Sequence, residues 1–283
     1  MAVIEVISPG FSSSIQDLGR TGFRKWGVPV SGAMDLEAAV LGNSLLQNPE
    51  NAAILEITLD GPALRFDSSL YFTLTGAVGH AQLGDQELKV NTPYQAQAGE
   101  ELRIGRCQGG VRVYLAVQGG FQSPLLLGSR SYYSPITPQS RLAKGDQLSV
   151  EPNSEYELKV WEIKQGKASL KKALGVFPGP ELGHLPEVVK EQLLTTSFTI
   201  AKENNRMAYQ LNELLPSFSY SMITSATLPG TVQLTPAGRP IVLMRDAQTT
   251  GGYPRVLQLD EASLNWLGQR STGDQVRFKL LER

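Results

Sequence analysis

The apolar run Pro240-Ile241-Val242-Leu243-Met244 leads directly into the polar run Arg245-Asp246-Ala247-Gln248-Thr249-Thr250-Gly251-Gly252-Tyr253-Pro254. The first run is typical of a buried strand, and the second of a loop at the end of that strand. Gly251 and Gly252 let a ligand approach the backbone closely, and Pro254 biases Tyr253 toward an extended conformation. The polar run therefore predicts either a functional loop or an ordinary Gly-Gly turn between two strands.

Short runs of β type recur along the chain, separated by Gly, Pro, Asn and Asp. Such spacing is typical of an all-β barrel or sandwich rather than of alternating strands and helices. Helical patterns are few. Asp35 is a candidate N-cap for a helix on which Ala38, Leu41 and Leu45 share one face. Shorter helices are predicted at 184–194 and 260–267. The predicted strands are 70–75, 87–90, 111–117, 157–163, 197–200, 231–234, 241–244 and 275–280.

The composition describes a globular protein with nearly balanced charge. Its 283 residues are 41% hydrophobic and 19% charged, with a net charge of −1, which suits one large or two medium domains. Such a balance gives no electrostatic reason to expect nucleic acid or an anionic membrane as a partner. No apolar run approaches the roughly 18 residues that span a bilayer. The first five residues carry no basic leader and Cys107 stands alone, so we expect a cytoplasmic protein.

The chain lacks the short motifs of several catalytic classes. His80 and His184 are not in a metal-ligand spacing, and no Cys-x-x-Cys occurs, so no metal centre is expected. No P-loop is present, and no Gly-x-Ser-x-Gly elbow of a serine hydrolase. Carboxylates and arginines are therefore the candidates for chemistry.

A weak internal repeat indicates two domains. Residues 141–150 resemble residues 269–278, and in each a Gly-Asp turn precedes an alternating strand. The polar linker Glu151-Pro152-Asn153-Ser154 follows the first copy. We therefore expect one domain at 1–155 and a second at 156–283, with some exchange of strands between the halves.

Two polar positions near the N-terminus each admit two interpretations. Asp17 and Arg20, three residues apart, either orient one another or clamp a carboxylate substrate, or they form a structural ion pair. Glu56 shares one strand face with Ile54 and Thr58. Beside apolar neighbours it would be a general acid or base with a raised pKa; otherwise it is a strand residue facing solvent.

A series of motifs runs along nearly the whole chain: 14–22, 27–35, 55–62, 114–120, 127–131, 177–181, 230–233, 273–278 and the loop 245–254. Together, and in this order, they resemble the motifs of a known family. The family contains the C subunit of 5-oxoprolinase, the KipI antagonist and the carboxyltransferase region of urea carboxylase, and is also called the allophanate hydrolase subunit 2 group. Its members are built from two cyclophilin-like β-barrels, which is the fold that the resemblance implies here.

The resemblance implies one pocket lined by the loop 245–254 and the segment Gln16–Arg20. We expect catalytic roles for Asp246, Tyr253 and Glu56. The segment Asn204-Asn205-Arg206-Met207-Ala208 departs from the family pattern, in which an acid and a glycine stand at 205 and 208. The predicted substrate-binding residues are Gln16, Asp17, Arg20, Arg206, Gln248, Thr249, Gly251 and Gly252.

Three functions are compatible with the resemblance. The first is the C subunit of an ATP-dependent 5-oxoprolinase, a hydrolase that opens 5-oxoproline to L-glutamate with companion A and B subunits, of which B is KipI-like, and is inactive alone. The second is a carboxyltransferase that takes carboxybiotin from a carrier made elsewhere, since no Met-Lys dipeptide for biotin attachment occurs. The third is a non-enzymatic regulator that binds a KipI-like protein. The motifs are common to all three, so the sequence leaves the choice open.

Overall fold

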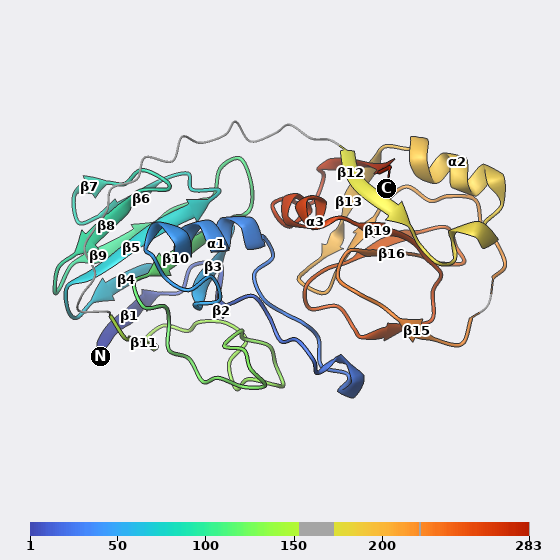
Figure 1. Cartoon of the computed structure of the whole chain (residues 1–283). Coiled ribbons are helices and arrows are strands. Elements are labelled where there is room, and N and C mark those ends of the chain that lie inside the picture. The colour runs from blue at the N-terminus through green and yellow to red at the C-terminus, as the bar shows by residue number, and fades with distance from the viewer. Residues whose placement is uncertain (153–172, 221, 283) are drawn as a thin grey trace. The chain divides into compact units, whose positions relative to one another are not determined.

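The computed structural model describes residues 1–152, 173–220 and 222–282 (Figure 1). The chain divides into two compact units. The first contains Met1–Arg20 and continues from Ser31, and the second contains Thr21–Val30 together with the C-terminal part of the chain. The boundary between them falls within 153–172, as does the boundary expected near 155, so both lie outside the described residues.

The first unit is built from two antiparallel sheets that enclose one hydrophobic core. Neighbouring strands in both sheets run antiparallel, which suits short connections at Gly-rich turns. The six-stranded sheet has the order β11 (Gln147–Val150), β1 (Ala2–Ser8), β4 (Ala63–Phe66), β9 (Glu101–Ile104), β6 (Ala81–Leu83) and β7 (Gln86–Glu87). The five-stranded sheet has the order β2 (Ser12–Gln16), β3 (Ile54–Thr58), β10 (Arg112–Val117), β5 (Leu70–Gly76) and β8 (Pro93–Ala96).

Helix α1 (Leu36–Leu45) covers the outer face of the five-stranded sheet (Figure 1). It begins where the sequence predicts, because the Asp35 side chain accepts a hydrogen bond from the backbone N–H of Ala38 at 3.1 Å. Every residue of β10 is buried, since the core lies on one face of this strand and α1 on the other. Two polar side chains of these strands, Glu56 on β3 and Arg112 on β10, are accordingly buried.

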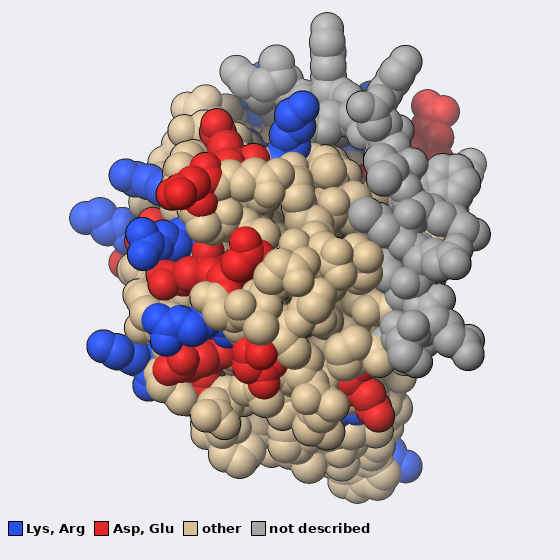
Figure 2. Space-filling model, turned by 90° about the vertical axis from the view of Figure 1, so that its left-hand side faces the viewer, with Lys and Arg blue, Asp and Glu red and all other residues tan. Residues whose placement is uncertain are grey.

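The six-stranded sheet carries ion pairs between neighbouring strands. Arg65 on β4 lies 3.3 Å from Glu5 on β1 and 3.9 Å from Glu101 on β9. Figure 2 views the molecule from the side of β7 and β9, and it shows basic and acidic side chains interleaved rather than segregated. Such exposed pairs contribute little to stability, and the described side chains of this face form no patch of one sign that would attract a polyanion.

The second unit is a closed barrel whose last strand pairs with its first in parallel. A two-stranded sheet, β15 (Ser225–Ala226) with β18 (Thr250–Gly251), lies outside the barrel order. The helical elements of this unit are η1 (Arg24–Trp26), η2 (Leu182–His184), α2 (Glu187–Thr195) and α3 (Glu261–Gly268). The barrel order is β12 (Ala173–Pro178), β19 (Arg255–Leu259), β16 (Thr231–Leu234), β17 (Pro240–Leu243), β14 (Ala208–Leu211), β13 (Phe198–Asn204) and β20 (Gln275–Leu280).

The internal repeat seen in the sequence is a repeated turn. Gly145 has φ 89° and Gly273 has φ 91°, a conformation that glycine adopts without strain. The carboxylate of Asp146 accepts from the N–H of Ala143 at 2.8 Å, and that of Asp274 accepts from the N–H three residues earlier at 2.9 Å. Each turn then opens the last strand of its unit that the structure describes.

The predicted mainly β class with few helices is confirmed, and the second unit is a closed barrel. The first half differs from a single closed barrel, because its strands hydrogen-bond as two separate sheets. The bounds of the strand predicted at 87–90 are wrong: β7 spans only Gln86–Glu87, and a turn begins at residue 90. The strand predicted at 157–163 lies outside the described residues. No described helix is long and apolar enough to cross a membrane.

Candidate functional site

Asp246 follows the strand β17 and pairs with Arg206. It lies in the polar run that was predicted to form a loop after this strand. The guanidinium of Arg206 donates to both oxygens of the Asp246 carboxylate, from Nε at 2.8 Å and from Nη2 at 3.1 Å. The backbone N–H of Asp246 in turn donates to the carbonyl of Arg206 at 2.8 Å. Two predicted site residues 40 positions apart are thus held in one orientation, and a charge-assisted bidentate pair is among the stronger polar contacts.

The loop that follows is fixed mainly through its backbone, and the Gln248 amide also donates to Oε1 of Gln233 at 3.5 Å. Thr227 donates from its hydroxyl to the carbonyl of Gln248 at 2.6 Å and from its N–H to the carbonyl of Thr249 at 3.0 Å. The Gln248 side chain is exposed, and Tyr253 is 43% exposed. The loop therefore presents an amide and a phenol from a braced backbone.

Gly251 is required by the packing of a buried glutamine. A Cβ on Gly251 would lie 2.5 Å from Nε2 of Gln233. That nitrogen donates to the carbonyl of Tyr253 at 3.2 Å, and Gln233 is only 2% exposed. The second glycine has more room, because a Cβ on Gly252 would come no closer than 3.4 Å to the carbonyl oxygen of Ile223. The first glycine of the pair is thus a packing requirement.

Arg24 braces the same loop from a distant part of the sequence. Its Nη2 donates to the carbonyl of Thr227 and, at 3.3 Å, to the carbonyl of Thr249. Sequence analysis missed this residue, although it lies between two family motifs. Its role became visible only in the structure, where the segment Thr21–Val30 belongs to the second unit.

A second carboxylate–arginine pair supports the other side of the two-stranded sheet. Arg255 donates to Glu181 from Nε at 2.9 Å and from Nη2 at 2.6 Å, and its Nη1 donates to the carbonyl of Ala226 at 2.7 Å. The hydrogen bonds from Arg255 lower the pKa of Glu181 below its ordinary value. Glu181 closes the Phe177-Pro178-Gly179-Pro180-Glu181 motif, so this motif has a structural role.

In the first unit, Asp17 holds a loop in place. Its carboxylate accepts hydrogen bonds from the hydroxyls of Ser129 and Ser131, both at 2.7 Å, and from the N–H groups of Gly19 at 2.8 Å and Arg130 at 2.6 Å. Asp17 is 7% exposed. With four donors on two oxygens, Asp17 is a positioning residue for the segment 129–131 rather than an open ligand for substrate.

The other N-terminal candidates are also buried within this network. Arg20 is 1% exposed and donates to the carbonyl of Ser131. The amide of Gln16 donates to the hydroxyl of Ser14 at 3.0 Å. The predicted segment therefore lies against the Gly-Ser-Arg-Ser motif, which sequence analysis used for the resemblance without assigning it a role.

Glu56 is buried, so the interpretation of a solvent-facing strand residue is wrong. One carboxylate oxygen accepts from the N–H of Met34 at 2.7 Å and from the hydroxyl of Tyr114 at 2.9 Å, and the other lies 3.7 Å from Nε of Arg112. Burial, and then the charges of Glu56 and Asp35, raise the pKa of Tyr114 well above its ordinary value. The Tyr114 hydroxyl also accepts from the N–H of Asp35 at 2.8 Å. Glu56 and Tyr114 thus fix the start of α1.

The predicted site residues fall into two groups, one in each unit. Those of the second unit surround the loop: Arg206, Asp246, Gln248, Thr249, Gly251, Gly252 and Tyr253. Those of the first unit adjoin the 129–131 loop or α1: Gln16, Asp17, Arg20 and Glu56. That the two groups line one pocket stays a prediction.

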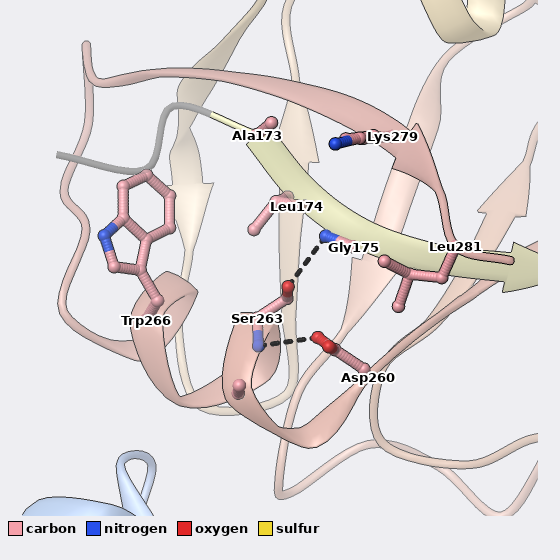
Figure 3. A pocket seen from close by; sticks show the side chains of 9 residues that line it. Ala173, Leu174, Gly175, Asp260, Ser263, Trp266, Lys279 and Leu281 are labelled. Carbon is pink, nitrogen blue, oxygen red and sulfur yellow. Dashed lines mark hydrogen bonds between the residues drawn. The ribbon is translucent and has the colours of Figure 1, made fainter. Parts of the chain in front are cut away.

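A cavity of about 290 Å³ lies elsewhere in the second unit (Figure 3). Figure 3 shows Trp266 at one side of it and Leu281 at the other, beside β12 and α3. The hydroxyl of Ser263 accepts from the N–H of Gly175 at 2.8 Å, and its own N–H donates to Asp260, also at 2.8 Å. None of the site residues predicted from the sequence lines this cavity. Within the described part of the chain, no three His, Cys, Asp or Glu residues are grouped to hold a metal ion.

The braced loop and the aspartate–arginine pair at its base lie in a region of the chain that matches a known family. The profile of the carboxyltransferase domain, subdomain A and B, matches residues 26–280. The chain belongs to this family, as its motifs predicted. Within the family it is 34% identical to the C subunit of 5-oxoprolinase from Escherichia coli, over 98% of this chain and 90% of that protein. It is 33% identical to the same protein of Haemophilus influenzae, over 98% of this chain and 91% of that protein.

Longer relatives contain the same region as one part of their chains. Urea amidolyase of Lachancea kluyveri is 29% identical over 97% of this chain, which spans 17% of that protein. The solved structure of TTHA0988 is 28% identical with a TM-score of 0.90, over 99% of this chain and 56% of that one. Urea carboxylase of Kluyveromyces lactis is 26% identical with a TM-score of 0.87, over 99% of this chain and 27% of that one.

Proposed function

We propose that this chain is the C subunit of an ATP-dependent 5-oxoprolinase that opens 5-oxoproline to L-glutamate. The observation that carries the proposal is the 34% identity to the C subunit of the Escherichia coli 5-oxoprolinase, which extends over nearly the full length of both chains. The region is embedded in longer proteins in the urea amidolyase relatives, whereas the two bacterial 5-oxoprolinase relatives have almost the same extent as this chain.

The chemistry requires activation of a lactam. Amide resonance makes the lactam carbonyl a poor electrophile, so phosphorylation of its oxygen by ATP precedes attack by water. The chain has no P-loop, so nucleotide handling is assigned to the companion A and B subunits, the latter KipI-like. The complex would lie in the cytoplasm, which suits the single cysteine.

In this proposal Asp246 is the group that orients or deprotonates the attacking water. Its carboxylate is aligned by two hydrogen bonds from Arg206, so it is held in place before substrate arrives. Gln248, Thr249 and Tyr253 supply hydrogen bonds to the substrate from the braced loop. Glu56 and Asp17 act as positioning residues, since donors already engage their carboxylates.

The test measures glutamate release from 5-oxoproline and ATP in a mixture of this chain and its two companions, and with each of the three omitted in turn. We expect glutamate and ADP only from the full mixture. Asp246→Asn, which keeps the shape of the side chain, is the matched control for the contribution of this chain. Full activity without this chain would contradict the proposal, and full activity from this chain alone would contradict the dependence on partners.

The family profile favours carboxyl transfer as a second candidate function. The profile describes a carboxyltransferase domain, and the urea amidolyase relatives share the whole region. In this case carboxybiotin is a substrate carried by another protein. The test supplies a biotinylated carrier protein, a biotin carboxylase, bicarbonate, ATP and urea. Transfer of labelled carboxylate to urea, with no glutamate formed from 5-oxoproline, would select this function. Tight binding of a KipI-like protein without either reaction would indicate a regulator.

A further inference from the structure

Arg245 in the loop 245–254 and three arginines that contact the loop or its supports can be compared, and three of these four have a carboxylate partner. Arg206 pairs with Asp246, Arg255 with Glu181, and Arg245 with Glu261. Arg24 differs, because its hydrogen-bond partners are the carbonyls of Thr227 and Thr249. Among the described residues no carboxylate lies within ion-pair distance of Arg24. Its positive charge is therefore not neutralised by a carboxylate within the described part of this unit.

The two terminal nitrogens of the Arg24 guanidinium differ in their hydrogen bonding. Its Nη2 donates to the loop, whereas Nη1 is buried and has no hydrogen-bond partner among the described residues. Burial lowers the pKa of Arg24 because it penalises the charged form. A buried donor without an acceptor and a cation without a counter-ion are both costly, and a bound anion is one of the explanations that such a group admits.

The groups around Arg24 define the ligand that would complete this site. The Gln248 side chain is exposed on the same loop, and the N–H and hydroxyl of Thr227 are already used by that loop. The one carboxylate of the loop, Asp246, is neutralised by Arg206 and therefore does not repel an anion strongly. A planar guanidinium fits a carboxylate better than an ammonium does.

We infer that Arg24 binds the carboxylate of a small substrate at the loop 245–254. This inference rests on the proposed function for the identity of the substrate, 5-oxoproline, whose ring carries one carboxylate beside the lactam. It replaces Arg20 in the role of carboxylate clamp, since Arg20 is buried against Ser131 in the first unit. Arg24 would hold the carboxylate while the lactam faces Asp246.

The experiment compares two ligands that differ only in the carboxylate. The affinities of 5-oxoproline and of 2-pyrrolidinone, the same lactam without the carboxylate, are measured by calorimetry on the assembled complex. Arg24→Gln should weaken 5-oxoproline binding about 10- to 100-fold and leave 2-pyrrolidinone binding unchanged. Arg24→Lys should recover part of the loss. Lys25→Gln is the matched control, because Lys25 is exposed with its ammonium 4.2 Å above the Trp26 ring, and it should bind both ligands as the wild type does.

The outcomes distinguish the role of Arg24 from the proposed 5-oxoprolinase function. Equal weakening of both ligands by Arg24→Gln would show that Arg24 only braces the loop, and unchanged binding of both would show that it does not face the ligand; either result overturns the inference. Absence of 5-oxoproline binding to the wild-type complex would overturn it as well. If the wild type binds 5-oxoproline through Arg24 but releases no glutamate, the inference stands and the proposed function fails.

Discussion

Arg206 and Asp246 bind each other in both directions. The Asp246 N–H donates to the Arg206 carbonyl, and the Arg206 guanidinium donates to both Asp246 oxygens. The arginine side chain is 22% exposed and the aspartate side chain 12%. The carboxylate is thus oriented by its partner without being closed off from solvent, as a group that handles water must be.

Asp246→Asn should lower kcat of the assembled complex about 10²- to 10⁴-fold, the usual contribution of a positioned general acid or base. It should also destabilise the chain by about 1–3 kcal/mol, because Arg206 loses its anionic partner. Arg206→Gln removes the same ion pair but keeps the carboxylate, and it serves as the control. We expect a similar loss of melting temperature with a smaller loss of kcat. Equal losses of kcat in both variants would assign the pair a structural role only.

Tyr253→Phe should leave stability within about 0.5 kcal/mol of the wild type, because the side chain is exposed. If its hydroxyl binds substrate, kcat/KM should fall by about 10-fold. Steady-state kinetics and a thermal melt on the same preparation check this expectation. A fall in melting temperature that parallels the loss of activity would indicate that the phenol supports the loop instead.

Asp17→Asn should destabilise the first unit, because the amide would place N–H donors against groups that are themselves donors. We expect a loss of about 3 kcal/mol, which corresponds to about 6–12 °C in melting temperature. Asp85→Asn, at an exposed turn of the same unit, should melt as the wild type does. An unchanged melting temperature for Asp17→Asn would contradict the positioning role.

Glu181 should make the second unit sensitive to acid. Arg255 lowers the pKa of Glu181 from its ordinary value of 4.5 in the folded chain, so the ionised form stabilises the fold above that pH. This stabilisation is lost as the pH falls through the lowered pKa of the folded state. The difference in unfolding free energy between wild type and Glu181→Gln should therefore be largest above about pH 5 and shrink as the pH falls below it. Urea unfolding at several pH values measures it; a difference that does not change with pH would place the contribution in packing rather than charge.

Local features of the fold could be predicted from the sequence with good accuracy. Asp35 and Asp260 both cap helices as expected, because a capping side chain bonds to an N–H three residues ahead. The alternating strands Thr231–Leu234 and Gln275–Leu280 have the predicted bounds. The helix predicted at 184–194 begins only at Glu187 as an α-helix, since Pro186 suits the position before a helix rather than its interior.

Contacts between distant positions could not be predicted in the same way. Asp246 and Arg206 were each candidates, but nothing local indicates that they bind each other across 40 positions. Arg24 contacts Thr227 across 203 positions, and no pattern near Arg24 shows it. Asp17 and Arg20 were expected to act together, and in the structure both bind the segment 129–131. Sequence spacing cannot show that this segment lies beside them.

The segment Thr21–Val30 limits how the gene for this protein can be divided or fused. Because the second unit includes this segment from the N-terminal part of the chain, no single break in the gene separates the two units. A fragment that began after residue 172 would lack Arg24 and the support it gives to the loop. Gene fusions should therefore carry the region whole, and the relatives agree: TTHA0988 and urea amidolyase, although longer, each match at least 97% of this chain. In these relatives the two units occur together, as the shared segment requires.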